Sequence, residues 1–362
     1  MLMIVGFHYV LNGGGAWISE QPVSVSKFIY QMIYMSGGWI GNFIFFVISI
    51  WYLLDRDLSL RSSLRRIWIL ERELLFWSLS LLLVTIWLRR EGIYSGGISV
   101  WAAKSVLPLS TGLWWYPTSY ALFLLFMPFL ARGVRALGCH MHKRLALICL
   151  TLWGFLGLIP KIDYNLSSAS VFVFIYWFIL ISYYRWYMHA LTVKQCWGLI
   201  GAGVAVMLLY WSATNILFAC TGKMAKTQVF IFDHWKLPTM MIGFGIFMLV
   251  VRTHFYSRVV NFVAASAFGV YLIHYYPPIW FDCITKYVGV EVMYDSRSPI
   301  LFGAAAIGGI FFVCLMLDMV RNVLFHFTVD RHRGRCFDRL YAWCAKNPIQ
   351  IRSHSSLHDA NE

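Results

Sequence analysis

Long apolar runs are the feature that most restricts how this chain can fold. A helix that crosses the roughly 30 Å hydrocarbon layer of a bilayer needs about 20 mostly apolar residues. Lipid supplies no water to the backbone, so a lipid-crossing run must be helical or part of a closed barrel. Apolar runs near that length recur along the 362 residues: 1–12, 33–54, 68–88, 112–130, 145–160, 168–184, 195–212, 237–251, 260–281 and 299–317.

The composition leads to the same class of protein. Hydrophobic residues make up 60% of the chain and charged residues 13%, with a mean hydropathy of +0.65, whereas about 25% of residues in soluble domains are charged. We therefore predict an all-α integral membrane protein, a multi-pass bundle of about ten transmembrane helices in the cell membrane. Residues 1–318 would form the transmembrane domain, and 319–362 a basic tail near anionic headgroups. The run at 1–12 is short for a span, which predicts a truncated first helix.

The basic residues predict which loops share a side of the membrane. The net charge is +14, and Lys and Arg concentrate in cytoplasmic loops of membrane proteins. Nineteen of the thirty lie in alternate segments: 55–67, 131–146, 183–196, 252–259 and 318–362. Ten lie in the intervening segments 13–32, 89–111, 160–167, 213–236 and 282–298. This bias predicts that both termini are cytoplasmic, and it explains the charge without a nucleic-acid partner.

The cysteines and the tail histidines do not predict a disulfide framework or a metal site. By the predicted topology, only Cys220 and Cys283 of the eight cysteines lie near the outer side, where disulfides form. The tail holds four possible metal ligands in a spacing that matches no standard zinc pattern: His326, His332, Cys336 and Cys344. We expect no bound metal.

Two histidines inside apolar runs are candidates for proton transfer. A titratable group in a membrane span is costly, so it usually faces the protein interior and serves a function. His8 follows Gly6 and Phe7, and His274 ends the sequence from Phe268. Imidazole exchanges protons near neutral pH and is the usual general base. For each histidine the alternative is a hydrogen bond to a neighbouring helix.

The third run begins with arginines that can bind an anion. Arg65 and Arg72 are seven residues apart, so a helix places them on nearly the same face, about 10 Å from each other. Two guanidinium groups at that spacing can hold different phosphates of one ligand. Glu71 and Glu73 flank Arg72 and are candidates to neutralise it in the membrane. The alternative for Arg65 and its neighbour Arg66 is a positive-inside anchor.

Four sequence segments, taken in order, resemble a known family. They are His8 with its apolar approach, the glycine-rich run through Asn42 to Ser49, the helix with Trp115, Tyr116 and Tyr120, and Phe268 to His274. In this order they resemble acyltransferase family 3, whose polytopic enzymes O-acetylate exopolysaccharides, capsules and O-antigens. The Trp-aromatic-x-x-x-Tyr helix is most similar to the capsule and exopolysaccharide branch.

The resemblance implies a membrane O-acyltransferase with no tightly bound cofactor. It would move an acetyl group from acetyl-CoA, as co-substrate, to a hydroxyl of a cell-surface polysaccharide or its lipid-linked precursor. His8 would be catalytic, and Arg65, Arg66 and Arg72 would bind the CoA phosphates. The remaining residues expected to line the site are Asn42, Trp115, Tyr116, Tyr120 and His274.

The chain departs from the family pattern at two places. The family arginine eleven residues before the histidine would precede Met1, so we expect residues upstream of the first helix or an inactive relative. The usual Arg-x-x-Arg reads Ile69-x-x-Arg72 here. The rival function is a secondary transporter or glycan-lipid flippase, although no repeated halves are evident in the sequence. The sequence leaves open the sugar, the acyl chain, an acyl-histidine intermediate and the oligomeric state.

Overall fold

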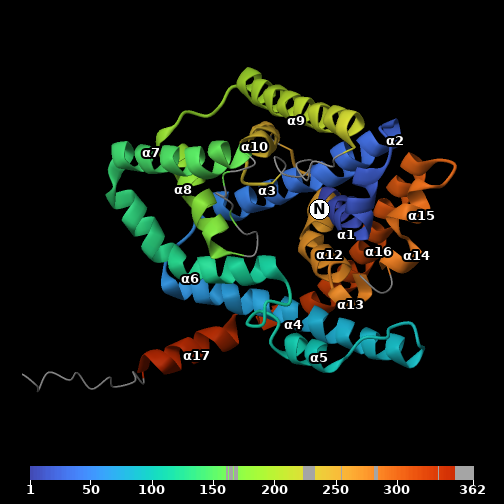
Figure 1. Cartoon of the computed structure of the whole chain (residues 1–362). Coiled ribbons are helices and arrows are strands. Elements are labelled where there is room, and N and C mark those ends of the chain that lie inside the picture. The colour runs from blue at the N-terminus through green and yellow to red at the C-terminus, as the bar shows by residue number, and fades with distance from the viewer. Residues whose placement is uncertain are drawn as a thin grey trace, which may run out of the picture.

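The apolar runs form helices that pack into one bundle. The computed structural model describes residues 1–159, 162, 166, 170–222, 233–253, 255–280, 284–332 and 334–346. Figure 1 shows α1 inside a ring of other helices, with α17 extending from the bundle toward the end of the chain. In chain order the elements are α1 (Leu2–Glu20), α2 (Val25–Phe28), η1 (Ile29–Met35), α3 (Ser36–Trp51), α4 (Leu60–Arg90), α5 (Ser99–Val106), α6 (Trp115–Ala136), α7 (Gly138–Cys149), η2 (Leu150–Phe155), η3 (Leu156–Leu158), α8 (Val171–Tyr187), α9 (Val193–Thr221), α10 (Leu237–Val251), α11 (Arg258–Ala265), α12 (Ala267–His274), α13 (Pro277–Ile279), α14 (Thr285–Tyr287), α15 (Val290–Tyr294), α16 (Pro299–Phe327), η6 (Asp330–His332) and α17 (Arg335–Lys346).

The predicted helical membrane architecture agrees with the structure at a coarse level. Among the described residues, five helical segments are long and apolar enough to cross a membrane: Val25–Trp51, Trp115–Ala136, Gly138–Leu158, Val193–Thr221 and Pro299–Phe327. Shorter apolar helices occupy Val171–Tyr187, Leu237–Val251 and Arg258–His274. The total of ten spans and the cytoplasmic location of the termini stay predictions.

Several helix bounds differ from the predicted ones. Helix α1 continues past residue 12 to Glu20, with a kink at Gly14, where φ is 152°. The run predicted at 260–281 divides into α11 and α12 at Ser266, which has φ −93° and ψ 0°. Helix α16 continues through the predicted domain boundary at 318 to Phe327. In that last part of α16, Arg321 pairs with Asp318 and with Glu73 of α4.

Gly38 brings α3 very close to α1 at the predicted catalytic histidine. A Cβ atom at Gly38 would overlap the Cβ atom of Phe7, the residue before His8, and would lie 2.9 Å from the Met3 carbonyl oxygen. One turn along α3, a Cβ at Gly41 would lie 3.1 Å from a side-chain carbon of Ile4. Small residues at such crossings let two membrane helices approach. The glycine-rich run therefore holds α1 against α3.

The segments predicted to share one side of the membrane contact one another. Asp55 pairs with Arg185, and the guanidinium of Arg185 also donates to the Trp51 carbonyl. Further contacts join the other predicted cytoplasmic segments: Arg135 over the Trp186 ring, Arg252 to the Leu191 carbonyl, and Arg61 to Asp338. All five segments thus gather at one end of the bundle. This arrangement agrees with the prediction, made from the Lys and Arg content of the loops, that these five segments share one side.

Candidate functional site

The structure brings the two predicted histidines into direct contact. Nδ1 of His8 lies 2.9 Å from Nε2 of His274, and both side chains are buried. His8 comes from α1 and His274 from the last turn of α12, a part of the chain 266 residues away. The ring of Tyr275 stacks on His8 with a centroid distance of 4.1 Å. The histidine pair is the centre of the candidate site.

The backbone determines which ring nitrogen of each neutral histidine carries a proton. Nδ1 of His274 lies 2.7 Å from the Val270 carbonyl oxygen, which can only accept, so this Nδ1 carries the proton. Nε2 of a neutral His274 then accepts, and Nδ1 of His8 donates to it. Nε2 of His8 is left with a free lone pair and no hydrogen-bond partner in the described residues. This is the protonation state that a general base or a nucleophile requires.

Three other predicted site residues line one small cavity near His8. The cavity, of about 10 Å³, is bounded by Met1, Ile4, Asn42, Phe45, Trp115, Tyr116 and Tyr271. Ile4 lies one helical turn before His8. Tyr271 joins the cavity to the histidine pair, with ring centroids 6.4 Å from His8 and 6.1 Å from His274. Segments from α1, α3, α6 and α12 therefore meet at this place.

Tyr116 is the hub of the aromatic wall. Its hydroxyl lies 2.7 Å from the Ser49 hydroxyl, so α3 and α6 are joined by a hydrogen bond. The rings of Tyr120 and Tyr271 both neighbour the Tyr116 ring, with centroid distances of 6.4 Å and 6.3 Å. Tyr120 does not line the cavity, but it packs against Tyr116, which does. Asn42 lines the cavity and makes no side-chain hydrogen bond among the described residues.

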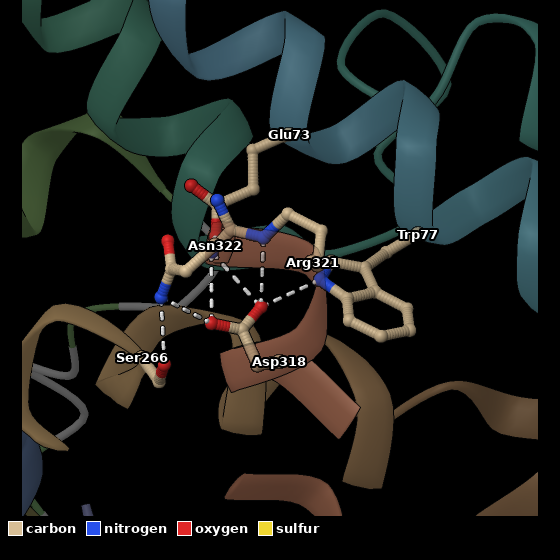
Figure 2. Close-up of polar contacts among 6 residues, drawn as sticks. All are labelled: Glu73, Trp77, Ser266, Asp318, Arg321 and Asn322. Atoms are coloured by element: carbon tan, nitrogen blue, oxygen red, sulfur yellow. Dashed lines mark hydrogen bonds and ion pairs between the residues drawn. The ribbon is translucent and has the colours of Figure 1, made fainter. Parts of the chain in front are cut away.

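A buried ionic network positions the helix that carries His274. Figure 2 shows Asp318 and Arg321 of α16 between α4 and α12, and both side chains are almost fully buried. Arg321 binds Asp318 and also Glu73 of α4, each at 2.8 Å. Trp77 of α4 donates to Asp318 at 2.9 Å. Each charge therefore has a partner of opposite sign, as a charge buried in a membrane requires.

The same network reaches the start of α12. Asn322 donates to Asp318 at 3.2 Å and to the Ser266 hydroxyl at 2.7 Å, and Ser266 directly precedes α12. A Cβ atom at Gly269 would overlap Oδ1 of Asp318, so only glycine fits against the carboxylate. The glycine of the Phe268–His274 motif thus has a structural reason. It lets α12 approach α16, and this fixes the helix that ends at His274.

The third-helix arginines face the tail rather than the histidine pair. Arg72 pairs with Asp330 at 3.1 Å, and Arg65 lies 3.9 Å from Asp338. The prediction that Glu71 and Glu73 neutralise Arg72 is wrong, because neither pairs with it. Glu73 pairs with Arg321, and Glu71 makes no ion pair among the described residues. Asp330 lies three residues after the end of α16, so the ion pair of Arg72 depends on a long-range approach that the local sequence does not encode.

Arg66 differs from its neighbours. It is half-buried and has no ion pair in the described residues. Of the three predicted CoA-binding arginines, Arg66 is therefore the one without a tail carboxylate as its partner among the described residues, whereas Arg65 and Arg72 pair with Asp338 and Asp330.

A third buried imidazole, that of His234 in the loop before α10, packs against α3. His234 stacks on Phe46 with a centroid distance of 5.1 Å and on Trp39 with 5.7 Å, on either side of Asn42 in α3. It is fully buried, and neither ring nitrogen has a hydrogen-bond partner among the described residues. The sequence carried no signal for His234, because it lies in a polar loop. Asp318 and Arg321 did carry a sequence signal, because they are charged residues at the end of an apolar run. They were missed because the predicted span ended at 317.

Comparisons with known proteins identify no relative. The chain matches no protein-family model, and no curated protein or solved structure matches it. Among the described residues, no group of three or more His, Cys, Asp or Glu side chains is placed to hold a metal ion. The function must therefore be argued from the histidine pair and its surroundings.

Proposed function

We propose that the protein is a membrane O-acyltransferase that moves an acetyl group from acetyl-CoA to a hydroxyl of a cell-surface glycan or its lipid-linked precursor. The observation that carries this proposal is the hydrogen bond from His8 to His274, which leaves Nε2 of His8 unprotonated. The family resemblance of the four sequence segments supplies the substrate class. The meeting of all four segments at one cavity supports it.

The chemistry follows from the lone pair on His8. Nε2 removes the proton of the acceptor hydroxyl while the oxygen attacks the thioester carbonyl carbon. The tetrahedral intermediate then collapses, the carbon–sulfur bond breaks, and the imidazolium returns its proton to the departing thiolate. The products are the acetyl ester and free coenzyme A. During the step, Nε2 of His274 keeps its contact with Nδ1–H of His8 and stabilises the imidazolium.

The aromatic surroundings suit this reaction. Tyr116, Tyr271 and Tyr275 exclude bulk water from the histidine pair, and water would otherwise compete with the acceptor for the thioester. Asn42 offers an amide N–H₂ at the cavity wall that can donate to the oxygen of the tetrahedral intermediate. The assignment of CoA phosphates to Arg65, Arg66 and Arg72 stays a prediction, and two of the three pair with tail carboxylates.

The test is acetyl transfer by purified protein in lipid nanodiscs, with radiolabelled acetyl-CoA and membrane glycan extract. We expect alkali-labile label in the glycan. Because general-base catalysis contributes about 10²–10⁴-fold, His8→Ala and His8→Gln should both reduce transfer by at least about 100-fold. Both variants should still bind coenzyme A. An active His8→Gln protein would disprove the base role, and unlabelled glycan with the unaltered protein would disprove the function.

A further inference from the structure

A polar pocket lies at the end of the bundle where the predicted cytoplasmic segments meet. Its volume is about 360 Å³. One wall is the loop that follows α3, and the other is the last turns of α6. The lining residues that carry charge are Arg56, Asp57, Arg132 and Arg135. The pocket shares no lining residue with the cavity beside His8.

The three arginines can offer N–H groups to a ligand. The side chains of Arg56 and Arg132 are exposed and make no hydrogen bond or ion pair in the described part of the chain. Arg135 lies over the Trp186 ring, with its guanidinium carbon 4.8 Å from the centroid. A guanidinium that stacks through its face keeps its N–H edge available, and its orientation is already restricted.

Nearby acids only partly balance these charges. Asp57 is the one acid in the lining, and it accepts a hydrogen bond of 2.5 Å from the Ser59 hydroxyl. Asp55 lies next to Arg56, but both of its carboxylate oxygens bind Arg185, at 2.7 and 3.0 Å. The pocket wall therefore keeps a net positive charge, which favours an anionic ligand.

Three arginines of α4 are a poorer anion site in this structure. Arg61 and Arg65 lie beside Asp338, and Arg72 pairs with Asp330. A phosphate at these positions would have to displace a carboxylate of the tail. Of the two groups of arginines, the one in the pocket is open to a ligand.

We propose that Arg56, Arg132 and Arg135 bind the phosphate groups of a nucleotide. Arginine forks match phosphate oxygens in pairs. The volume lies within the roughly 300–1,000 Å³ range of small-molecule pockets, which is more than one phosphate needs. That the nucleotide is the phosphorylated adenosine end of coenzyme A rests on the proposed function.

The geometry of α6 connects this pocket to the candidate catalytic site. Tyr116 begins the helix at the cavity, and Pro128 lies at the pocket twelve residues later, about 18 Å along the axis. The extended pantetheine arm of coenzyme A can cover a distance of this order. A nucleotide in the pocket would thus direct its thioester toward His8.

Titration calorimetry with adenosine 3′,5′-bisphosphate tests the proposal directly, with adenosine as the phosphate-free probe. The protein would be held in phosphatidylcholine nanodiscs. We expect the bisphosphate to bind, adenosine to bind at least tenfold more weakly, and the affinity to fall as salt rises. Arg132→Gln and Arg56→Gln should each weaken bisphosphate binding at least threefold, and together at least tenfold. Arg258→Gln is the matched control, because Arg258 is exposed on a predicted cytoplasmic segment outside the pocket.

Unchanged bisphosphate affinity in the double variant, with an unaltered melting temperature, would overturn the proposal. A second outcome would also overturn the proposal. If phosphatidylglycerol nanodiscs protect Arg132 from modification by phenylglyoxal and the bisphosphate does not, the pocket is a lipid-headgroup site. The two proposals fail separately. If acetyl transfer keeps its KM for acetyl-CoA in the double variant, the pocket assignment is wrong and the enzyme proposal stands. If the bisphosphate binds through the arginines but no acetyl transfer occurs, the enzyme proposal is wrong and the nucleotide pocket stands.

Discussion

Nδ1 of His8 and Nε2 of His274 lie 2.9 Å apart, and the second ring nitrogen of His274 is held by the Val270 carbonyl. The carbonyl fixes the proton on His274, and His274 in turn fixes the proton on His8. His274 is therefore a positioning residue for His8. Neither histidine lines the small cavity beside the pair.

His274→Leu tests that role. The variant removes the acceptor of the His8 Nδ1–H, so Nε2 is no longer kept unprotonated and oriented. Loss of an outer partner that orients a functional group typically costs about 10–100-fold, and we expect kcat to fall by that order while KM for acetyl-CoA stays the same. His274→Gln keeps a carbonyl acceptor and should recover part of kcat. Steady-state kinetics over a pH series would check this, and full activity of His274→Leu would contradict it.

Gly38→Ala should loosen the junction of α1 and α3. The added methyl group would overlap Phe7, and inserting a methyl into a packed interior costs about 1–3 kcal/mol. We expect a lower melting temperature in detergent and a loss of activity at temperatures where the parent is stable. Gly308→Ala is the control, since a Cβ there meets no atom within 4 Å. Equal melting temperatures for the two variants would show that the close approach is not needed.

Arg321→Met should destabilise the bundle strongly. It leaves the carboxylate of Asp318 buried with only the Trp77 and Asn322 donors, and breaking a buried ion pair costs about 3–5 kcal/mol. Adding Asp318→Asn removes the unpaired charge and should restore much of the loss. Thermal unfolding of the single and double variants would measure the difference. A double variant less stable than Arg321→Met would contradict this account.

The pairing of Asp55 with Arg185 makes stability depend on pH in a defined direction. The hydrogen bond from Arg185 lowers the pKa of Asp55 below its usual 3.8. A carboxyl whose pKa is lower in the folded state adds stability above its unfolded pKa and loses it as the pH falls through the folded value. Asp55→Asn should therefore lower the melting temperature at pH 7, and the gap to the parent should close below about pH 4. Glu91→Gln, at an exposed acid, serves as the control, and a gap that persists at low pH would contradict the prediction.

The sequence located the histidines but not their relationship. His8 and His274 were recognisable because a titratable residue in an apolar run is costly in lipid. That they bond to each other depends on where α1 and α12 cross. The predicted span ended at 317, which left Asp318 at the domain boundary and Arg321 in the predicted tail. In the structure α16 continues to Phe327, and Arg321 pairs with Asp318 and Glu73.

By itself, the sequence determined the helical membrane architecture and the alternation of basic loops. Both follow from properties that add along the chain, namely the apolar length a bilayer needs and the cost of moving cations across it. Only the tertiary structure decided that Arg72 pairs with Asp330, that the His8 lone pair is free, and that Arg56 and Arg132 share a pocket. These outcomes depend on distances between helices far apart in sequence, and such distances are fixed by close packing and by the pairing of buried charges.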